Sequence, residues 1–224
     1  MVSNEKKSIF DSVVFAIKPG ETVLVEHTSV SSPELFLYLL LWRCIEKGIP
    51  VIVDDIADTF HEYVTRLSLM GLPVEGLSKV PVIKIGGEKK VGNILGNVEV
   101  RRYSLDFKSY REVYEKVVPE EPVCNPVIGL HKLFVALDIQ DVRGLVRNIT
   151  NFVGDKSRFA LYIINKDSLV RVVPEILALL EEVSSSVLQW EVEKNIYKLR
   201  VIKASNIHIL GSELSLHIKD IFGI

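Results

Sequence analysis

The sequence has little of what marks metal-binding and membrane-spanning proteins. Its 224 residues include only two cysteines, Cys44 and Cys124, which are far apart and form neither a CxxC pair nor any metal-ligand spacing. The longest apolar run, LFLYLLLW at residues 35–42, is much shorter than the roughly 18–20 residues that cross a bilayer. We therefore expect no metal centre and no association with a membrane.

The chain also lacks an excess of charge of either sign. Lysine and arginine total 27 and aspartate and glutamate total 29, which gives a net charge of −2. A nucleic-acid-binding domain usually carries a strongly basic face, so this balance argues against nucleic acid as a partner. No apolar segment follows the two lysines near the start of the chain, and we therefore expect a cytoplasmic protein.

Core-forming residues, in contrast, are plentiful. The hydrophobic fraction is 48% and the mean hydropathy is +0.25. A chain of this length buries roughly 70% of the surface that it exposes when unfolded. No repeat, low-complexity segment or Pro-rich or Ser-rich linker divides it. We predict a single domain over residues 1–224, in which an N-terminal helix (1–18) precedes the core (19–224).

The first third of the chain alternates between strand and helix patterns. TVLVE at residues 22–26 and PVIVDD at 50–55 are apolar runs typical of buried parallel strands. Helices are predicted at 32–47 and 59–70, each followed by a glycine. Such a unit implies parallel strands joined by right-handed crossovers.

The remaining elements continue this pattern. We predict strands at residues 80–87, 98–103, 126–130, 158–165 and 214–218, and helices at 107–119, 138–153 and 170–185. The Gly-rich segment 86–97 is interpreted as a mobile hairpin loop between the first two of these strands. VLQWEVEKNIYKLRVIKA at 187–204 predicts an antiparallel hairpin near the C-terminus.

The stretch GETVLVEHTSVSSPELFLYLL at residues 20–40 has the layout of a phosphate-binding strand, loop and helix. Together with the later strand ALYIIN and the closing hairpin, it resembles the RecA/KaiC-like branch of the P-loop ATPases. More narrowly, the chain is similar to the archaeal DUF257 family, a degenerate relative of that branch. The resemblance implies a three-layer α/β/α fold with a mostly parallel central sheet and a C-terminal antiparallel hairpin.

The residues that would hold a phosphate are nevertheless missing. In the P-loop pattern G-x-x-x-x-G-K-[ST], the four fixed positions fall on His27, Ser32, Pro33 and Glu34. Pro33 removes an N–H donor and a cation, and Glu34 places an anion near the γ-phosphate position. Two like charges about 4 Å apart repel by roughly 4 kcal/mol at an effective dielectric near 20. Gly129 stands where the resemblance expects the acidic Mg²⁺ ligand of Walker B, so we predict no ATPase activity and no cofactor.

The strand ends also offer a candidate pocket that is not a phosphate site. Asp54 and Asp55 close a strand, Asp58 follows, and His27 closes the preceding strand. In open α/β sheets, ligands bind beyond the carboxyl ends of the strands, so these four side chains form a candidate general-base or cation pocket. The alternative is structural: acidic residues complement a helix N-terminus, and a lone histidine hydrogen-bonds within its loop.

Two hypotheses for function follow. The favoured one is a non-catalytic RecA/KaiC-like domain that acts as a binding or scaffold protein and self-associates as a homo-oligomer, with a protein partner of unknown identity. The alternative is an enzyme or small-molecule binder with a remodelled pocket at the strand ends. Self-association is expected through apolar residues of half-exposed C-terminal strands, unless the N-terminal helix covers them: Val187, Leu188, Trp190, Ile207, Ile209 and Leu210.

Overall fold

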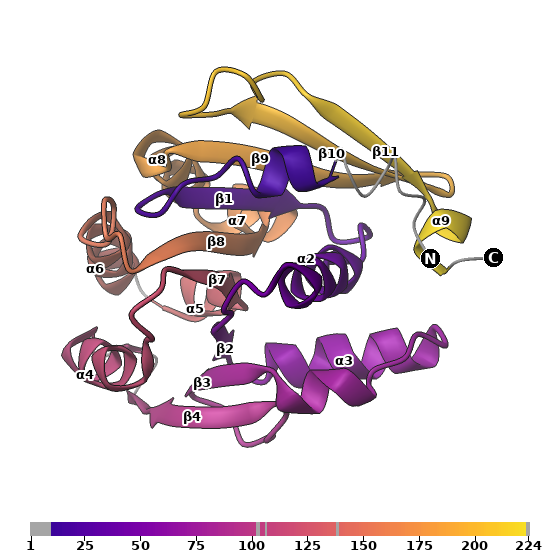
Figure 1. Ribbon diagram of the computed structural model, residues 1–224. Coiled ribbons are helices and arrows are strands. Elements are labelled where there is room, and N and C mark those ends of the chain that lie inside the picture. The colour runs from indigo at the N-terminus through magenta and orange to yellow at the C-terminus, as the bar shows by residue number, and fades with distance from the viewer. Residues whose placement is uncertain (1–9, 102–103, 106, 138, 223–224) are drawn as a thin grey trace.

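The computed structural model describes residues 10–101, 104–105, 107–137 and 139–222 (Figure 1). A nine-stranded sheet forms the centre, in the order β11-β10-β9-β1-β8-β7-β2-β3-β4, and a two-stranded ribbon pairs β5 with β6. The strands are β1 (Thr22–His27), β2 (Val53–Ile56), β3 (Pro81–Ile85), β4 (Asn93–Val98), β5 (Val100–Arg101), β6 (Ser104–Leu105), β7 (Val123–Ile128), β8 (Arg158–Asn165), β9 (Ser186–Glu193), β10 (Ile196–Lys203) and β11 (Glu213–His217).

Helices cover both faces of this sheet (Figure 1). The helices are α2 (Pro33–Lys47), α3 (Thr59–Leu69), the 3₁₀ turn η1 (Glu75–Lys79), α4 (Phe107–Val117), α5 (Leu130–Ala136), α6 (Ile139–Thr150), α7 (Lys166–Val172), α8 (Pro174–Val183) and α9 (Ile218–Phe222). Residues 10–14, α2 and α3 pack on one face, and α4 to α8 pack on the other. Among the helices described, none combines the length and the apolar character needed to cross a bilayer.

The strand directions confirm the predicted architecture. β1 lies between β8 and β9 and runs parallel to both. The pairs β7–β8, β2–β7 and β2–β3 are parallel as well. β9, β10 and β11 form the antiparallel part, and Lys194 turns the β9–β10 hairpin with φ of 59°. The fold is therefore a three-layer α/β/α domain with a mostly parallel sheet and a C-terminal antiparallel hairpin.

The Gly-rich segment departs from its predicted form. Residues 86–97 were expected to be a hairpin loop, but β4 lies within them and runs parallel to β3, with Pro81 opposite Asn93. The chain returns along β3 through Gly86, Gly87 and Gly92, all of which have positive φ. A Cβ on Gly92 would collide with the Val82 side chain and the Val80 carbonyl, so this return path requires glycine. The expected strand at 98–103 is reduced to β5, and residues 102–103 lie outside the described residues.

One helix prediction is corrected at a proline and one strand prediction at a glycine. The single helix expected at 170–185 is two helices, α7 and α8, which meet at Val173 because Pro174 has no N–H to continue the first helix. The strand expected to reach residue 130 ends at Ile128. Gly129 then takes a left-handed conformation with φ of 83°, and α5 begins one residue later.

The apolar residues expected on a half-exposed C-terminal surface are mostly buried. Val187, Leu188, Trp190 and Ile209 are each at most 6% exposed. Leu188, Trp190 and Ile209 share one core cluster with Phe10 and Phe36, whose ring lies 5.6 Å from Trp190. Val187 packs in the cluster on the opposite face. Only Ile207 and Leu210 of the expected set are exposed, at 75% and 54%.

Two aromatic residues of α2 provide a matched test of this packing. Phe36 is fully buried, whereas Trp42 is 46% exposed on the outer side of the same helix. Phe36→Ala should lower the free energy of unfolding by about 3–5 kcal/mol because it removes buried apolar contacts and leaves a cavity. Trp42→Ala should cost about 1 kcal/mol or less. Guanidinium denaturation of both variants checks the difference, and equal losses would show that the assigned burial is wrong.

Candidate functional site

The loop that follows β1 forms hydrogen bonds within itself and with the side chains that surround it. The Ser29 N–H donates to Asp167 Oδ2 at 2.8 Å, and the Thr28 N–H donates to Ser31 Oγ at 3.2 Å. Trp190 Nε1 donates to the Ser31 carbonyl oxygen at 2.8 Å from the sheet side. Backbone amides that would face a phosphate in a nucleotide-binding loop are thus used within the chain, one of them by a carboxylate.

The start of α2 carries Ser32, Pro33 and Glu34, which the sequence comparison aligned with the phosphate-binding pattern. Ser32 occupies the N-cap position with φ of 46°, and its side chain makes no capping hydrogen bond. Pro33 follows at the first turn. Glu34 is 2% exposed, and its Oε2 lies 3.3 Å from Arg66 Nη1 on α3. An arginine thus balances a buried negative charge at the helix N-terminus.

His27 faces a second histidine that the sequence analysis missed. The rings of His27 and His131 lie edge to face with centroids 5.9 Å apart. His27 Nδ1 lies 2.9 Å from the Thr28 carbonyl oxygen and therefore carries the proton, which leaves the buried Nε2 without a partner in the described part of the chain. Burial lowers the pKa of His27 to about 4, and burial together with His27 lowers the pKa of His131 to about 3. The only sequence signal was the place of His131 just after β7.

Asp55 and Asp58 are held together by a lysine of the neighbouring strand. Lys84 Nζ lies 2.7 Å from Asp55 Oδ2 and also pairs with Asp58 Oδ1. The N–H groups of Glu88 and Lys89 donate to Asp58 as well. Burial opposes ionisation of Asp58, but the hydrogen bonds from Lys84 and the two amides dominate and lower its pKa to about 2. The pair therefore anchors the loop after β3.

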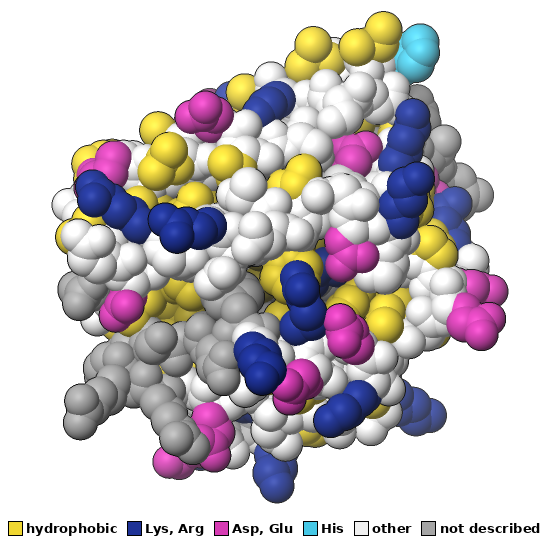
Figure 2. Space-filling view, turned by 90° about the vertical axis from the view of Figure 1, so that its left-hand side faces the viewer, with side chains coloured by type: hydrophobic (Ala, Val, Ile, Leu, Met, Phe, Trp, Pro, Cys, Tyr) yellow, Lys and Arg dark blue, Asp and Glu magenta, His cyan; other side chains and the backbone are white. Residues whose placement is uncertain are grey.

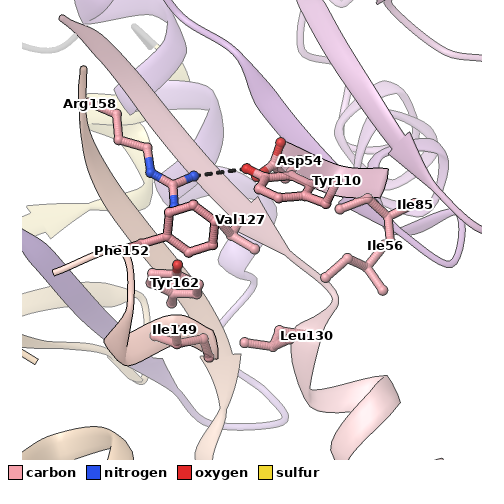
Figure 3. Close-up of a pocket in the computed structure, with 10 residues that line it drawn as sticks. All are labelled: Asp54, Ile56, Ile85, Tyr110, Val127, Leu130, Ile149, Phe152, Arg158 and Tyr162. Carbon is pink, nitrogen blue, oxygen red and sulfur yellow. Dashed lines mark hydrogen bonds between the residues drawn. The ribbon is translucent and has the colours of Figure 1, made fainter. Parts of the chain in front are cut away.

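Asp54 points to the opposite face of the sheet and belongs to another cluster (Figure 3). Tyr110 donates its hydroxyl proton to Asp54 Oδ2 at 2.6 Å, and Arg158 Nη1 donates to the Tyr110 hydroxyl oxygen at 2.8 Å. The same Nη1 donates to Asn125 Oδ1 at 2.7 Å. Burial raises the pKa of Asp54 to about 6, although Arg158 and Tyr110 favour its ionised form.

Aromatic rings surround the guanidinium group of this cluster. The Arg158 Cζ atom lies 4.3 Å from the centroid of Phe152 and 5.1 Å from that of Tyr114. Beside the guanidinium is a cavity of about 30 Å³, bounded by Asp54, Tyr110, Phe152, Arg158 and Tyr162 and closed by aliphatic side chains (Figure 3). This cluster could not be predicted from the sequence, because its members come from positions 54 to 162.

The predicted four-residue pocket is therefore not assembled as one site. Only Asp55 and Asp58 share a contact, through Lys84. His27 lies against His131, and Asp54 is bound to Tyr110 on the other face. Within the described ranges, no three His, Cys, Asp or Glu side chains are grouped closely enough to hold a metal ion.

Comparisons with known proteins give a family and a fold. The model of a family described as "Pyrococcus protein of unknown function, DUF257" matches residues 12–215. A solved structure from Pyrococcus horikoshii OT3 is 34% identical, with a TM-score of 0.81, and the match covers 92% of this chain and 96% of that one. The flagellar accessory protein FlaH from Methanocaldococcus jannaschii is 9% identical with a TM-score of 0.57, over 96% and 91% of the two chains, which shows the fold alone. No curated protein matches the sequence.

The histidine pair predicts a loss of stability in mild acid. Both pKa values lie below the usual histidine value of 6.5. The two neutral histidines therefore contribute their full share of stability above pH 6.5, and this contribution is lost as pH falls toward 4 and 3. The lowered pKa of His27 alone should reduce the free energy of unfolding by on the order of 3 kcal/mol over this range, since each pKa unit corresponds to about 1.4 kcal/mol. Urea denaturation of wild type and of the His27→Gln, His131→Gln double variant between pH 7 and pH 4 measures it.

The double variant should show a flatter dependence on pH than wild type. Asp54 acts in the opposite direction, because its raised pKa adds stability below about pH 6. Asp54 is present in both proteins, so its effect on stability cancels in the comparison. Identical pH profiles for the two proteins would show that the histidines are not buried as neutral groups.

Proposed function

This chain belongs to DUF257, a family of Pyrococcus proteins of unknown function, and from that premise we propose that it is a non-catalytic RecA/KaiC-like domain. In this proposal it works as a self-associating binding or scaffold protein and neither binds nor hydrolyses ATP. The proposal rests on the loop after β1, where Asp167 occupies an amide that a phosphate would need.

The chemistry of the loop supports this proposal. A phosphate at a helix N-terminus is held by backbone N–H groups and by the positive end of the helix dipole. Here Asp167 accepts from the Ser29 amide, Pro33 has no N–H, and the buried Glu34 carboxylate already lies at the N-terminus of α2. A nucleotide would bring several negative charges beside two carboxylates, with no lysine in the motif position to offset them.

The end of β7 adds a second, steric argument. Gly129 follows β7 directly, at the position where the resemblance expects a Mg²⁺-binding carboxylate. A Cβ atom there would collide with the Thr59 hydroxyl oxygen and the Ile56 carbonyl oxygen. An acidic side chain therefore has no room at this position unless α3 moves.

The enzyme alternative has less support at the strand ends. A catalytic pocket needs its groups within hydrogen-bond reach of one substrate atom. His27, Asp54 and the Asp55–Asp58 pair instead have separate partners, and Asp55 and Asp58 are both ion-paired with Lys84.

Self-association is proposed through the hydrophobic end of the C-terminal hairpin. Ile202 on β10 and Ile207 and Leu210 in the following loop are 50%, 75% and 54% exposed. This loop lies at the top of Figure 1, and hydrophobic side chains gather at the top of the face in Figure 2. The small net charge provides little repulsion between copies.

Calorimetry tests the nucleotide part of the proposal. Titration of the protein with ATP and Mg²⁺ should give no binding heat, because no N–H array or cation is available for the phosphates. Glu34→Ala serves as the comparison. An ATP affinity of micromolar order in wild type would contradict the proposal, and its loss in Glu34→Ala would place that binding at the start of α2.

Light scattering tests the self-association. The mass should exceed the 25.3 kDa of one chain and should rise with protein concentration. Leu210→Asp should shift the mass toward that of one chain, because it places a charge in the proposed contact. Leu69→Asp is the matched control, since Leu69 is 82% exposed at the end of α3, and should leave the mass unchanged. A wild-type mass of one chain at every concentration would rule the proposal out.

A further inference from the structure

The fold brings together the two cysteines, which are far apart in the sequence. Cys44 lies in the last turn of α2, and Cys124 is the second residue of β7. Both are fully buried in the same core cluster, on the face of the sheet that α2 covers. The two thiols are free and share a hydrogen bond. Since the chain has no other cysteine, all of its thiols are in this one pair.

Backbone hydrogen bonds hold the pair in place. The Ile49 N–H donates to the Cys44 carbonyl oxygen at 2.9 Å, where α2 ends. The chain then runs directly beside β7. The Cys124 N–H donates to the Pro50 carbonyl oxygen at 2.8 Å, and the Ile52 N–H donates to the Cys124 carbonyl oxygen at 3.1 Å. The backbone of Cys124 is thus paired with a segment that follows Cys44 by only a few residues.

Two adjacent thiols can bind a metal ion or be oxidised to a disulfide. A structural metal site needs about four ligands. The part of the chain that the structure describes holds no group of three His, Cys, Asp or Glu side chains close enough to bind an ion. Oxidation needs no further group, because the two sulfur atoms bond to each other. The contact between these thiols therefore favours oxidation over metal binding.

We propose that Cys44 and Cys124 are a redox pair, which exchange with a small-molecule disulfide converts into a cross-link between α2 and β7. First, the Cys44 thiolate attacks one sulfur atom of the reagent, forms a mixed disulfide and releases one thiolate. The Cys124 sulfur then attacks the Cys44 sulfur, which closes the protein disulfide and releases the second thiolate. The two cysteines lose two electrons and two protons, and the reagent takes up both to become two thiols.

Cys44 should react first because it lies at the end of a helix. Residues 45–48, which complete α2 and follow it, are exposed. Helix ends fray, so opening of the last turn brings the Cys44 thiol to solvent. Cys124 instead lies in a strand that is paired on both sides. Burial and the neighbouring Cys44 thiol raise the pKa of Cys124, so it stays protonated and covered until the mixed disulfide forms beside it.

Closure of the bond requires little change in the fold. Bonded sulfur atoms lie closer together than hydrogen-bonded ones, so the last turn of α2 has to shift slightly toward β7. The cross-link closes a long loop between positions 44 and 124. Such a link stabilises a protein mainly by restricting its unfolded chain. This inference does not depend on the proposed scaffold function.

Intact-mass spectrometry of the full chain tests the proposal. Incubation with excess oxidised glutathione at about pH 8, near the ordinary thiol pKa, should remove about 2 Da, the mass of two hydrogen atoms, and leave no glutathione bound. Because the chain has only two cysteines, this loss from a single chain identifies the pair. Refolding from guanidinium in the same reagent should give the same product without the opening step.

Thermal unfolding then measures the effect of the cross-link. The midpoint should rise by on the order of 10 °C relative to the reduced protein, because the closed loop is long. Dithiothreitol should restore both the mass and the midpoint of the reduced form.

Cys44→Ala and Cys124→Ala are the matched controls, since each keeps one of the two thiols. Neither variant should show the rise in midpoint. Cys124→Ala should retain one glutathione on Cys44, because no second thiol is present to displace it. Three results would each overturn the proposal: wild type that is unchanged or carries two glutathione molecules even after refolding, a cross-linked form that unfolds no higher than the reduced one, or an equal rise in either variant.

Discussion

The positive charge of Arg158, buried at the start of β8, determines which residues must pack on one face of the sheet. A buried guanidinium is tolerated only where hydrogen bonds and a counter-charge compensate for the lost water. Here the compensation comes from Asp54 on β2, Asn125 on β7 and Tyr110 on α4. Three adjacent parallel strands and the helix above them are thereby fixed relative to one another by a single side chain.

The other face of the sheet is organised around aromatic rings. Phe10, Phe36, Trp190 and Tyr197 form a continuous aromatic series from the N-terminal helix through α2 to the hairpin. The loop after β1 lies at the edge of this series and is bound to it through the Trp190 indole N–H. A loop that is packed from below and hydrogen-bonded to Asp167 from the side has little freedom to wrap a phosphate. The loop after β1 is thus packed as part of the core.

Much of the fold could be predicted from the sequence, because β1, α2, β8 and the β9–β10 hairpin each have a strong periodic pattern with turn residues at their ends. The departures from the P-loop pattern at four positions were read from the sequence and stay a prediction about function. The Gly-rich segment after β3 could not be assigned, since glycines permit a reversal but do not decide whether the next strand pairs parallel or antiparallel. Burial at the C-terminal hairpin was also misjudged, because the residues that pack on it, Phe36 of α2 among them, are remote in sequence. The Asp54 cluster was missed for the same reason, since Tyr110 and Arg158 are remote in sequence.

The environments of the two tryptophans give the molecule an intrinsic optical reporter. Trp190 is fully buried and donates to the loop after β1, whereas Trp42 is half exposed on α2. Emission from Trp190 should be blue-shifted and shielded from aqueous quenchers, and emission from Trp42 should not. Opening of the loop would break the indole hydrogen bond and admit water beside one fluorophore while leaving the other unchanged. Local movement of this loop can therefore be separated from global unfolding within a single unlabelled spectrum.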